Sequence, residues 1–421
     1  MADTQRTLDA LWRIEGARIV ATLAKMTGDL GQAEDLAQEA LVDALAQWPG
    51  EGIPKNAGAW ITAVAKRKAI DAWRRTTRLD ERQRELARNL RESTEQAWEP
   101  IDDDVLRLVF TACHPVLSRE AQVALTLRVV GGLRTEEIAR MMLVPVATVQ
   151  QRIVRAKKTL AAAKIPFEAP EAQAWGERLS AVLAVIYLVF TEGYAATAGD
   201  DLIRRELANE ALRLGRVLLG LLPREPEVAG LVALMEIQAS RFSARISRDG
   251  SPILLADQDR SRWDHSQIMR GRRALERADA LRHGRGFYAL QAAIAECHAV
   301  ARSVGETDWD RIVLLYGALC SLAPGPVVEL NRAVAVSMTE GPDAALRIVD
   351  HLAQQGALAS SHLLPSVRGE LLARLGRNPE AVAEFLLAAS LVGNRRMGAV
   401  FRAKAEDLQS RSSGELGRPP Q

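Results

Sequence analysis

Two neighbouring stretches decide the fold of this chain, AEDLAQEALVDALAQW at 33–48 and AWITAVAKRKAIDAWRR at 59–75. Apolar residues in the first stretch recur at helical spacing and form a single stripe: Ala33, Leu36, Ala37, Ala40, Leu41, Ala44, Leu45 and Trp48. Such a stripe predicts an amphipathic helix with one buried face. The opposite face is polar and mostly acidic, and a solvated surface is its simplest interpretation: Glu34, Asp35, Gln38, Glu39 and Asp43.

The second stretch predicts a basic helix that begins near Trp60, after a Gly/Pro loop that follows Trp48. Its basic residues fall in pairs seven positions apart, Arg67 with Arg74 and Lys68 with Arg75. Residues at this spacing lie two turns apart on one side of a helix, so they form a ridge suited to following phosphates. The tryptophans have a simpler interpretation as core residues, which we favour for Trp48 and Trp73.

Composition indicates an all-α chain of several domains. The chain has 421 residues, is 48% hydrophobic and only 5% aromatic, and is rich in Ala, Leu, Arg and Glu. The net charge of +2 does not by itself indicate a nucleic-acid partner. The distribution of charge along the chain does indicate such a partner. Residues 55–91 include eleven Lys and Arg against four acids, and residues 134–164 include seven against two. Residues 92–104, between them, include six acids and no base. Two basic modules joined by an acidic linker are therefore expected.

The second basic module has the pattern of a helix-turn-helix, with a first helix in RTEEIARMM (134–142) and a second over 146–160. Thr135 is expected to cap the first helix. In the second helix, Val149, Ile153, Ala156 and Leu160 form the inward stripe. The residues left outward are amides and cations, as a recognition helix in the major groove requires: Gln150, Gln151, Arg152, Arg155, Lys157 and Lys158. A helical hairpin with a solvated basic face is the alternative.

In these quoted stretches, together with TLRVVGGLRTEEIARMM at 126–142 and TVQQRIVRAKKTL at 148–160, the chain resembles regions 2 and 4 of extracytoplasmic-function (ECF) sigma factors. The resemblance implies RNA polymerase core and promoter DNA as partners, with region 2 on the β′ clamp helices and region 4 on the β flap. It assigns polymerase binding to Asp35, Gln38 and Glu39. It assigns the minus-ten element to the 48–58 loop and to Trp60, Lys66, Arg67, Lys68, Arg74 and Arg75. It assigns the minus-thirty-five element to Thr148, Gln150, Gln151, Arg152 and Arg155.

The chain departs from that family at three of these positions. Arg67 stands where the family often has Asn, Leu143 replaces the usual turn glycine, and Pro145 replaces the usual Ser cap. Proline suits the first position of a helix, so the turn is expected to persist in altered form.

A long helical extension follows the two modules. It resembles the C-terminal extension of sigma factors that carry tetratricopeptide-like repeats, in IYLVFTEGYAAT (186–197), LLADQDRSRWD (254–264), LQAAIAECHA (290–299) and VVELNRAVAV (327–336). Two segments, 332–349 and 369–386, share one design, and their prolines, Pro342 and Pro379, are 37 positions apart. Stacked helical pairs offer surfaces for protein segments, so we expect a regulatory or protein-binding role, with another protein or within the chain.

One segment of the extension, residues 248–268, breaks the helical pattern and is rich in Asp, Arg, Trp and His. A ligand site is one interpretation, and a loop of salt bridges at an interface is the one we favour. The three cysteines, Cys113, Cys297 and Cys320, lack the spacing of a zinc site. We expect no metal, no cofactor, no membrane segment and no enzymatic motif, and a cytoplasmic location.

The sequence thus predicts an all-α protein with region 2 at 8–91, an acidic linker at 92–104, region 4 at 105–165 and the extension at 170–410. The function expected is that of a sigma factor whose activity the extension modulates. A helix-turn-helix activator with a helical sensor domain, binding DNA alone, is the alternative, although it leaves the acidic face at 34–43 unexplained.

Overall fold

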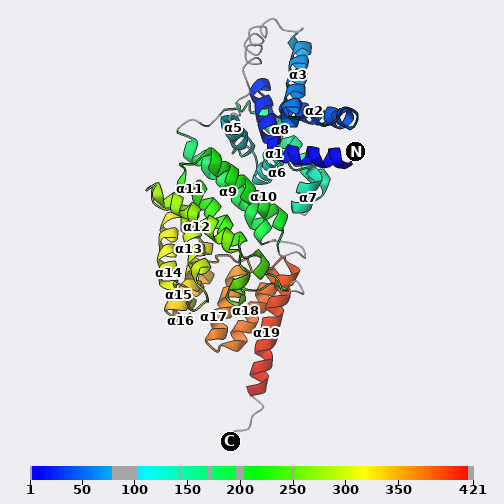
Figure 1. The fold of residues 1–421 in the computed structure, drawn as a ribbon. Coiled ribbons are helices and arrows are strands. Elements are labelled where there is room, and N and C mark those ends of the chain that lie inside the picture. Colours follow the sequence, from blue (N-terminus) through cyan, green and yellow to red (C-terminus); the bar gives the residue numbers. More distant parts are fainter. Residues whose placement is uncertain are drawn as a thin grey trace. The chain divides into compact units, whose positions relative to one another are not determined.

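The computed structural model describes residues 2–77, 102–142, 144–168, 170, 173–195, 203–247 and 251–415 (Figure 1). In these ranges the regular structure is helical, apart from one isolated bridge between Ile246 and Pro252, so the all-α prediction is confirmed. The chain divides into two compact units, Met1–Ile186 and Tyr187–Gln421. Among the described helices, none is both long and apolar enough to cross a bilayer.

The described part of the first module consists of α1 (Ala2–Thr27), α2 (Leu30–Glu51) and α3 (Ala57–Thr77). The predicted stripe of α2 is buried for the most part, with Trp48 only 2% exposed, although Leu41 and Leu45 lie outside the buried set. The Gly/Pro loop is shorter than predicted, because α2 continues through Pro49 and α3 begins three residues before Trp60. Gly52 ends α2 with a φ of +86°, a conformation in which a side chain would be strained.

The second module consists of α5 (Asp102–Ala112), α6 (Arg119–Val129), α7 (Thr135–Met142) and α8 (Val146–Ala162). The four residues of the inward stripe of α8 are buried, as predicted. The prediction for the start of α7 needs correction. Thr135 is its first helical residue, and the Glu137 carboxylate accepts a hydrogen bond from the Arg134 backbone N–H at 2.8 Å. Glu137 can therefore satisfy this N–H, while the acids of the first turn still favour the helix dipole.

The two modules of the first unit pack on each other, mainly through α1. Ion pairs cross this contact, with Arg13 at 2.7 Å from Glu137 and Lys25 at 3.4 Å from Asp104. The predicted acidic linker at 92–104 lies mostly outside the described residues, and its last three residues form the first turn of α5. Two modules that are distant in sequence therefore share one contact surface.

The second unit begins within α9 (Trp175–Tyr194) and continues with α10 (Arg205–Leu221), α11 (Pro226–Ala239), α12 (His265–Ala280) and α13 (Phe287–Val300). Helix α11 is nearly all apolar and is buried against its neighbours α10, α12 and α13. At Gly230, a Cβ atom would lie 2.6 Å from the Ala289 backbone nitrogen, so glycine is what allows α11 and α13 to approach this closely. Three 3-10 turns precede α12: Phe242–Ala244, Leu255–Asp257 and Arg260–Arg262.

The rest of this unit is a succession of helices in which each packs mainly on the one before and the one after (Figure 1). They are α14 (Trp309–Leu322), α15 (Pro326–Thr339), α16 (Pro342–Gln354), α17 (Leu363–Arg374), α18 (Asn378–Leu391) and α19 (Arg395–Glu415). Helices α15 to α18 form the two similar segments expected from the sequence, each with a positive-φ glycine before its second helix. The tetratricopeptide-like character of this array stays a prediction.

Candidate nucleic-acid interface

The outward face of α8 carries the residues predicted to read the upstream element. Gln150, Gln151 and Arg155 are exposed, and Thr148 and Arg152 are half-buried. The buried stripe fixes the rotation of α8 about its axis, because Val149 and Ile153 pack inward between these positions. Amide and guanidinium groups on one exposed face can make paired hydrogen bonds to base edges and contacts to phosphates.

Helix α3 presents part of the predicted basic ridge. Arg67 is exposed and Lys66 is half-buried, while Arg74 is exposed and lies 3.6 Å from Asp71. The side chains of Trp73 and Arg75 lie outside the described residues. The ridge therefore rests on fewer described cations than the sequence suggested.

Trp60 is half-buried and meets Trp48 edge to face, with ring centroids 5.5 Å apart. Trp48 is a core residue, as predicted. The indole of Trp60 is thus held against a buried ring while part of it remains accessible beside the loop. An aromatic group in this position can stack on an unpaired base.

Lys68, predicted to lie on the basic ridge, is directed instead toward the acidic face of α2. Its Nζ atom lies 3.0 Å from Asp43 and 3.4 Å from Glu39. The hydrogen bond to Asp43 is the main cause of a raised pKa for the Lys68 ammonium group. Lys68 therefore links the predicted DNA-binding helix to the predicted polymerase-binding face.

The acidic face forms a shallow groove around Val42, a large apolar side chain that is 62% exposed. The side chains of Asp35 and Glu39 beside it are 75% and 60% exposed, and Gln38 also lines the groove. An exposed apolar centre with an acidic rim suits a basic, partly apolar partner surface. The three predicted polymerase-binding residues are thus brought together.

Glu34 is not part of the solvated face to which the sequence assigned it, because it is only 4% exposed. Its carboxylate lies 2.5 Å from Arg128 Nε on α6 and 2.5 Å from Lys157 Nζ on α8. Burial acts to raise the pKa of Glu34, but the two cations outweigh burial and hold the pKa below its ordinary value. Lys157, which we expected to face DNA, is directed at α2 instead. The contacts of Glu34 with Arg128 and Lys157 join residues about 90 or more positions apart, so the local sequence pattern does not predict them.

The start of α9 also belongs to the first unit, which the sequence did not indicate. The Trp175 ring lies 5.1 Å from the Phe110 ring, and Arg178 donates a hydrogen bond of 2.7 Å to the Phe110 carbonyl. The first turns of the predicted extension therefore complete the core of the second module.

The polar segment before α12 differs from our favoured interpretation, since its described Asp and Arg side chains form no ion pairs with one another. Asp259 accepts a hydrogen bond from the Ser261 backbone N–H at 3.0 Å, and Asp264 accepts one from the Gln267 N–H at 3.0 Å. Arg260 donates to the carbonyls of His298 and Ala301 at 2.5 and 2.8 Å. The segment is held by caps and backbone contacts.

Comparison with known proteins gives a family match for three segments of the chain. Residues 11–79 match Sigma-70 region 2, residues 107–160 match Sigma-70 region 4, and residues 178–279 match a family of unknown function (DUF6596). The chain is 43% identical over 402 residues to an uncharacterized protein of Rhizobium meliloti, covering 92% of this chain and 93% of that protein. It is 27% identical over 171 residues to a probable ECF RNA polymerase sigma factor, SigI, of Mycobacterium tuberculosis, covering 39% of this chain and 58% of that protein. No solved structure shows significant similarity.

These matches define a class of protein. The chain carries both conserved regions of the sigma-70 type and is a sigma-70 family factor, a DNA-binding protein of transcription initiation. It belongs to the same family as the Rhizobium meliloti protein, with which it shares nearly its whole length.

Proposed function

We propose that this chain is an ECF-type sigma factor that directs RNA polymerase core to specific promoters and that its extension modulates this activity. The domains proposed are region 2 at 8–91, the linker at 92–104, region 4 at 105–165 and the extension at 170–410. The observation that carries the proposal is the exposed Gln150, Gln151 and Arg155 face of α8, in a chain that also carries region 2.

In the proposed promoter complex, α8 enters the major groove of the minus-thirty-five element. Gln150 and Gln151 read base edges, while Arg155 holds phosphate, with Thr148 and Arg152 at the flanks. The exposure of the first three residues and the buried stripe behind them support this assignment. Region 4 also contacts the β flap of the polymerase in this proposal.

For the minus-ten element, we propose that the loop before α3 and the accessible part of Trp60 receive an unpaired base. Lys66, Arg67, Arg74 and Arg75 would then neutralise the phosphates on either side. Support comes from the half-buried indole of Trp60, which is held by Trp48, and from the exposure of Arg67 and Arg74.

We assign docking on the β′ clamp helices to the groove lined by Asp35, Gln38, Glu39 and Val42. Two of its acids already have partners in the free chain, Asp35 with Lys157 at 3.3 Å and Glu39 with Lys68 at 3.4 Å. Polymerase binding must replace these two pairs, and the cost is small because the Asp35 and Glu39 carboxylates are exposed to solvent. Lys68, also assigned to DNA, is released from Glu39 and Asp43 in the same step.

The experiment that tests this function is in vitro transcription with purified core polymerase, the full chain and a library of promoter fragments that includes the region upstream of its own operon. We expect transcripts that start at defined sites and require both core and this chain. Transcription that proceeds equally without this chain, or DNA binding that is specific in the absence of core, would favour an activator instead.

A further inference from the structure

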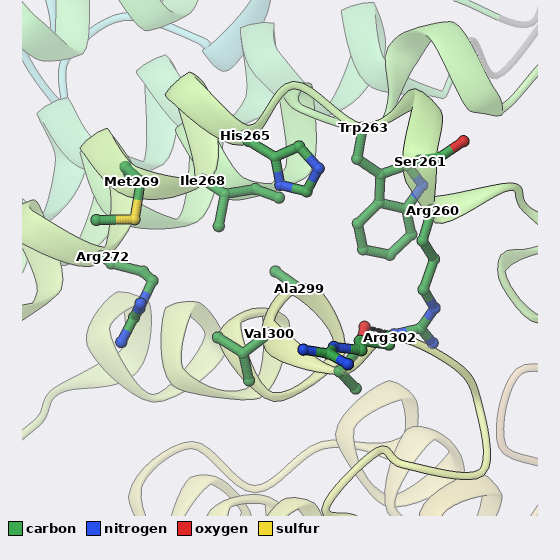
Figure 2. Close-up of a pocket in the computed structure, with 11 residues that line it drawn as sticks. Arg260, Ser261, Trp263, His265, Ile268, Met269, Arg272, Ala299, Val300 and Arg302 are labelled. Carbon is green, nitrogen blue, oxygen red and sulfur yellow. Dashed lines mark hydrogen bonds between the residues drawn. The ribbon is translucent and has the colours of Figure 1, made fainter.

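A concave groove in the second unit has no role in the function proposed above. It lies between the first turns of α12 and the C-terminal end of α13, and its volume is about 490 Å³. Figure 2 shows His265 and Ile268 on one side of it, Ala299 and Val300 on the other, and Arg260 and Arg272 toward opposite ends. Its size falls in the range of roughly 300–1,000 Å³ that is usual for small-molecule sites.

Much of the lining is apolar. The indole of Trp263 is 3% exposed and packs with Ile268, which is 5% exposed, so this wall is fixed by the core. Met269 and Val300 are large apolar side chains that remain 45% and 52% exposed. Water covers apolar surface in this groove that a ligand would bury with a gain in free energy.

The polar lining consists of three arginines together with Ser261 and His265, and none of the described lining residues carries a carboxylate. Arg260 donates hydrogen bonds to two neutral carbonyls and to the Thr307 hydroxyl. Burial and Arg241 lower the pKa of Arg260, and Glu306 balances its charge only in part. Arg302 is exposed and makes no ion pair within the described residues. Arg272 is already paired with Glu296 at 3.0 Å. Among the described residues, Arg302 therefore brings a guanidinium charge without an ion-pair partner to the groove, and the charge of Arg260 is only partly balanced.

His298, near the end of α13, is partly buried and lies close to two arginine side chains. Burial, together with Arg241 and Arg260, lowers the pKa of His298 to about 4. Two acids of the segment are engaged elsewhere, since Asp259 accepts a hydrogen bond from Ser261 and Asp264 caps α12. A negatively charged ligand is the species that this environment stabilises.

We infer that this groove binds a small organic acid, a carboxylate carried on an apolar body, as an effector of the extension. The apolar body would lie against Trp263, Ile268 and Val300, and the carboxylate would accept hydrogen bonds from Arg302 and His265. Arg260 already binds the carbonyls of His298 and Ala301, so these two backbone groups at the end of α13 are not available to an extended peptide. This inference does not depend on the proposed sigma-factor activity.

The test uses the full chain and three probes with one apolar body: phenylbutyrate, its neutral amide and the cation phenylbutylamine. Binding is measured by isothermal titration calorimetry and by saturation-transfer NMR. We expect saturable binding of phenylbutyrate with a dissociation constant on the order of 1 mM, as usual for a ligand of this size. The amide should bind at least about tenfold more weakly, and the amine should not bind. Inorganic phosphate should also bind more weakly than phenylbutyrate, because it lacks the apolar body.

Two variants place the binding in this groove. Arg302→Ala should weaken phenylbutyrate binding about tenfold through loss of the charge-assisted hydrogen bond, and Val300→Asp should abolish it. Both positions are exposed, so the thermal unfolding midpoint should not change. Arg273→Ala is the matched control, because Arg273 is an exposed arginine of α12 outside the groove. Equal binding of acid and amide, equal binding of phosphate, or the same affinity in all three variants would overturn the inference.

Discussion

The carboxylate of Glu34 on α2 and the ammonium group of Lys157 on α8 lie 2.5 Å apart, with Glu34 buried between the two modules. Arg128 on α6 completes the cluster at 2.5 Å. A buried carboxylate that touches two cations joins the region-2 and region-4 modules at a point that neither module could stabilise alone. The cluster also fixes the recognition helix α8 through Lys157, a residue that the sequence pattern had assigned to the DNA-facing side.

Loss of the Glu34 charge should destabilise the first unit. Glu34→Gln leaves the partly buried Arg128 without its carboxylate partner and leaves Lys157 paired only with the exposed Asp35, a change that typically costs about 3 kcal/mol. Urea unfolding followed by circular dichroism measures the effect on the full chain. Glu51→Gln, an exposed position at the end of the same helix, should change the free energy of unfolding by less than about 0.5 kcal/mol. Equal stability of these two variants would show that the cluster does not join the modules.

Stability of the second unit should fall in mild acid because of His298. Its pKa is lowered to about 4 in the folded chain, whereas an unfolded histidine titrates near about 6.5. At pH values between the two pKa values, the unfolded chain binds more protons than the folded chain. The free energy of unfolding therefore decreases as the pH falls, by roughly 2 kcal/mol at pH 5.

Thermal unfolding of the full chain at pH 7 and pH 5 measures this effect. His298→Gln should lose a smaller part of its stability between the two pH values than the unmodified chain. His283→Gln, at an exposed histidine, should retain the full dependence. A dependence that is identical in all three proteins would remove His298 as its source.

Gln151 and Arg155 should have different roles on α8. Gln151→Ala should change which bases are preferred at the upstream element, because a bidentate amide contact discriminates by about 1–3 kcal/mol. Arg155→Ala should weaken all promoters to a similar degree and reduce the salt dependence, because a phosphate contact carries no base information. Selection from randomised upstream elements in the presence of core polymerase distinguishes the two. Unchanged base preference for Gln151→Ala would show that this helix does not read that element.

Removal of charge at Asp35 and Glu39 should weaken core polymerase binding by about tenfold or more. The neutral pair Asp35→Asn and Glu39→Gln is preferable to charge reversal, because a lysine at these positions would face Lys157 and Lys68. Titration of labelled protein with core measures the affinity, and Glu51→Gln is the control. The same affinity for the double variant and the control would exclude this face as the docking surface.

The extension should be required for, or strongly modulate, promoter-dependent transcription. A chain ending at Ile165 is a poor test, because it removes the Trp175 and Arg178 contacts with Phe110 in the second module. A chain ending at Ala195 keeps these contacts and removes the helices after α9. Its helicity should match the retained helices, and its transcript yield should differ several-fold from that of the full chain on several promoters. Equal yields would show that the later helices are dispensable for initiation.

Helical periodicity allowed most of the fold to be predicted. The inward stripe of α8 is buried as expected, and Gln150, Gln151 and Arg155 beside it are exposed, because side-chain spacing along a helix fixes which positions share a face. Helix ends were predicted less well. The true start of α7 depends on a backbone hydrogen bond to Glu137, a contact that residue type alone does not specify.

The sequence by itself determined the helices, their apolar stripes and the two basic modules, since these depend on residues a few positions apart. Only the tertiary structure decided which charges face solvent. Glu34 and Asp35 are adjacent in the sequence, yet one is buried against Arg128 and Lys157 and the other is 75% exposed. The gathering of Arg260 and Arg302 around one apolar groove likewise depends on how α12 packs against α13. Burial and ion pairing depend on distances between residues far apart along the chain, and packing alone sets those distances.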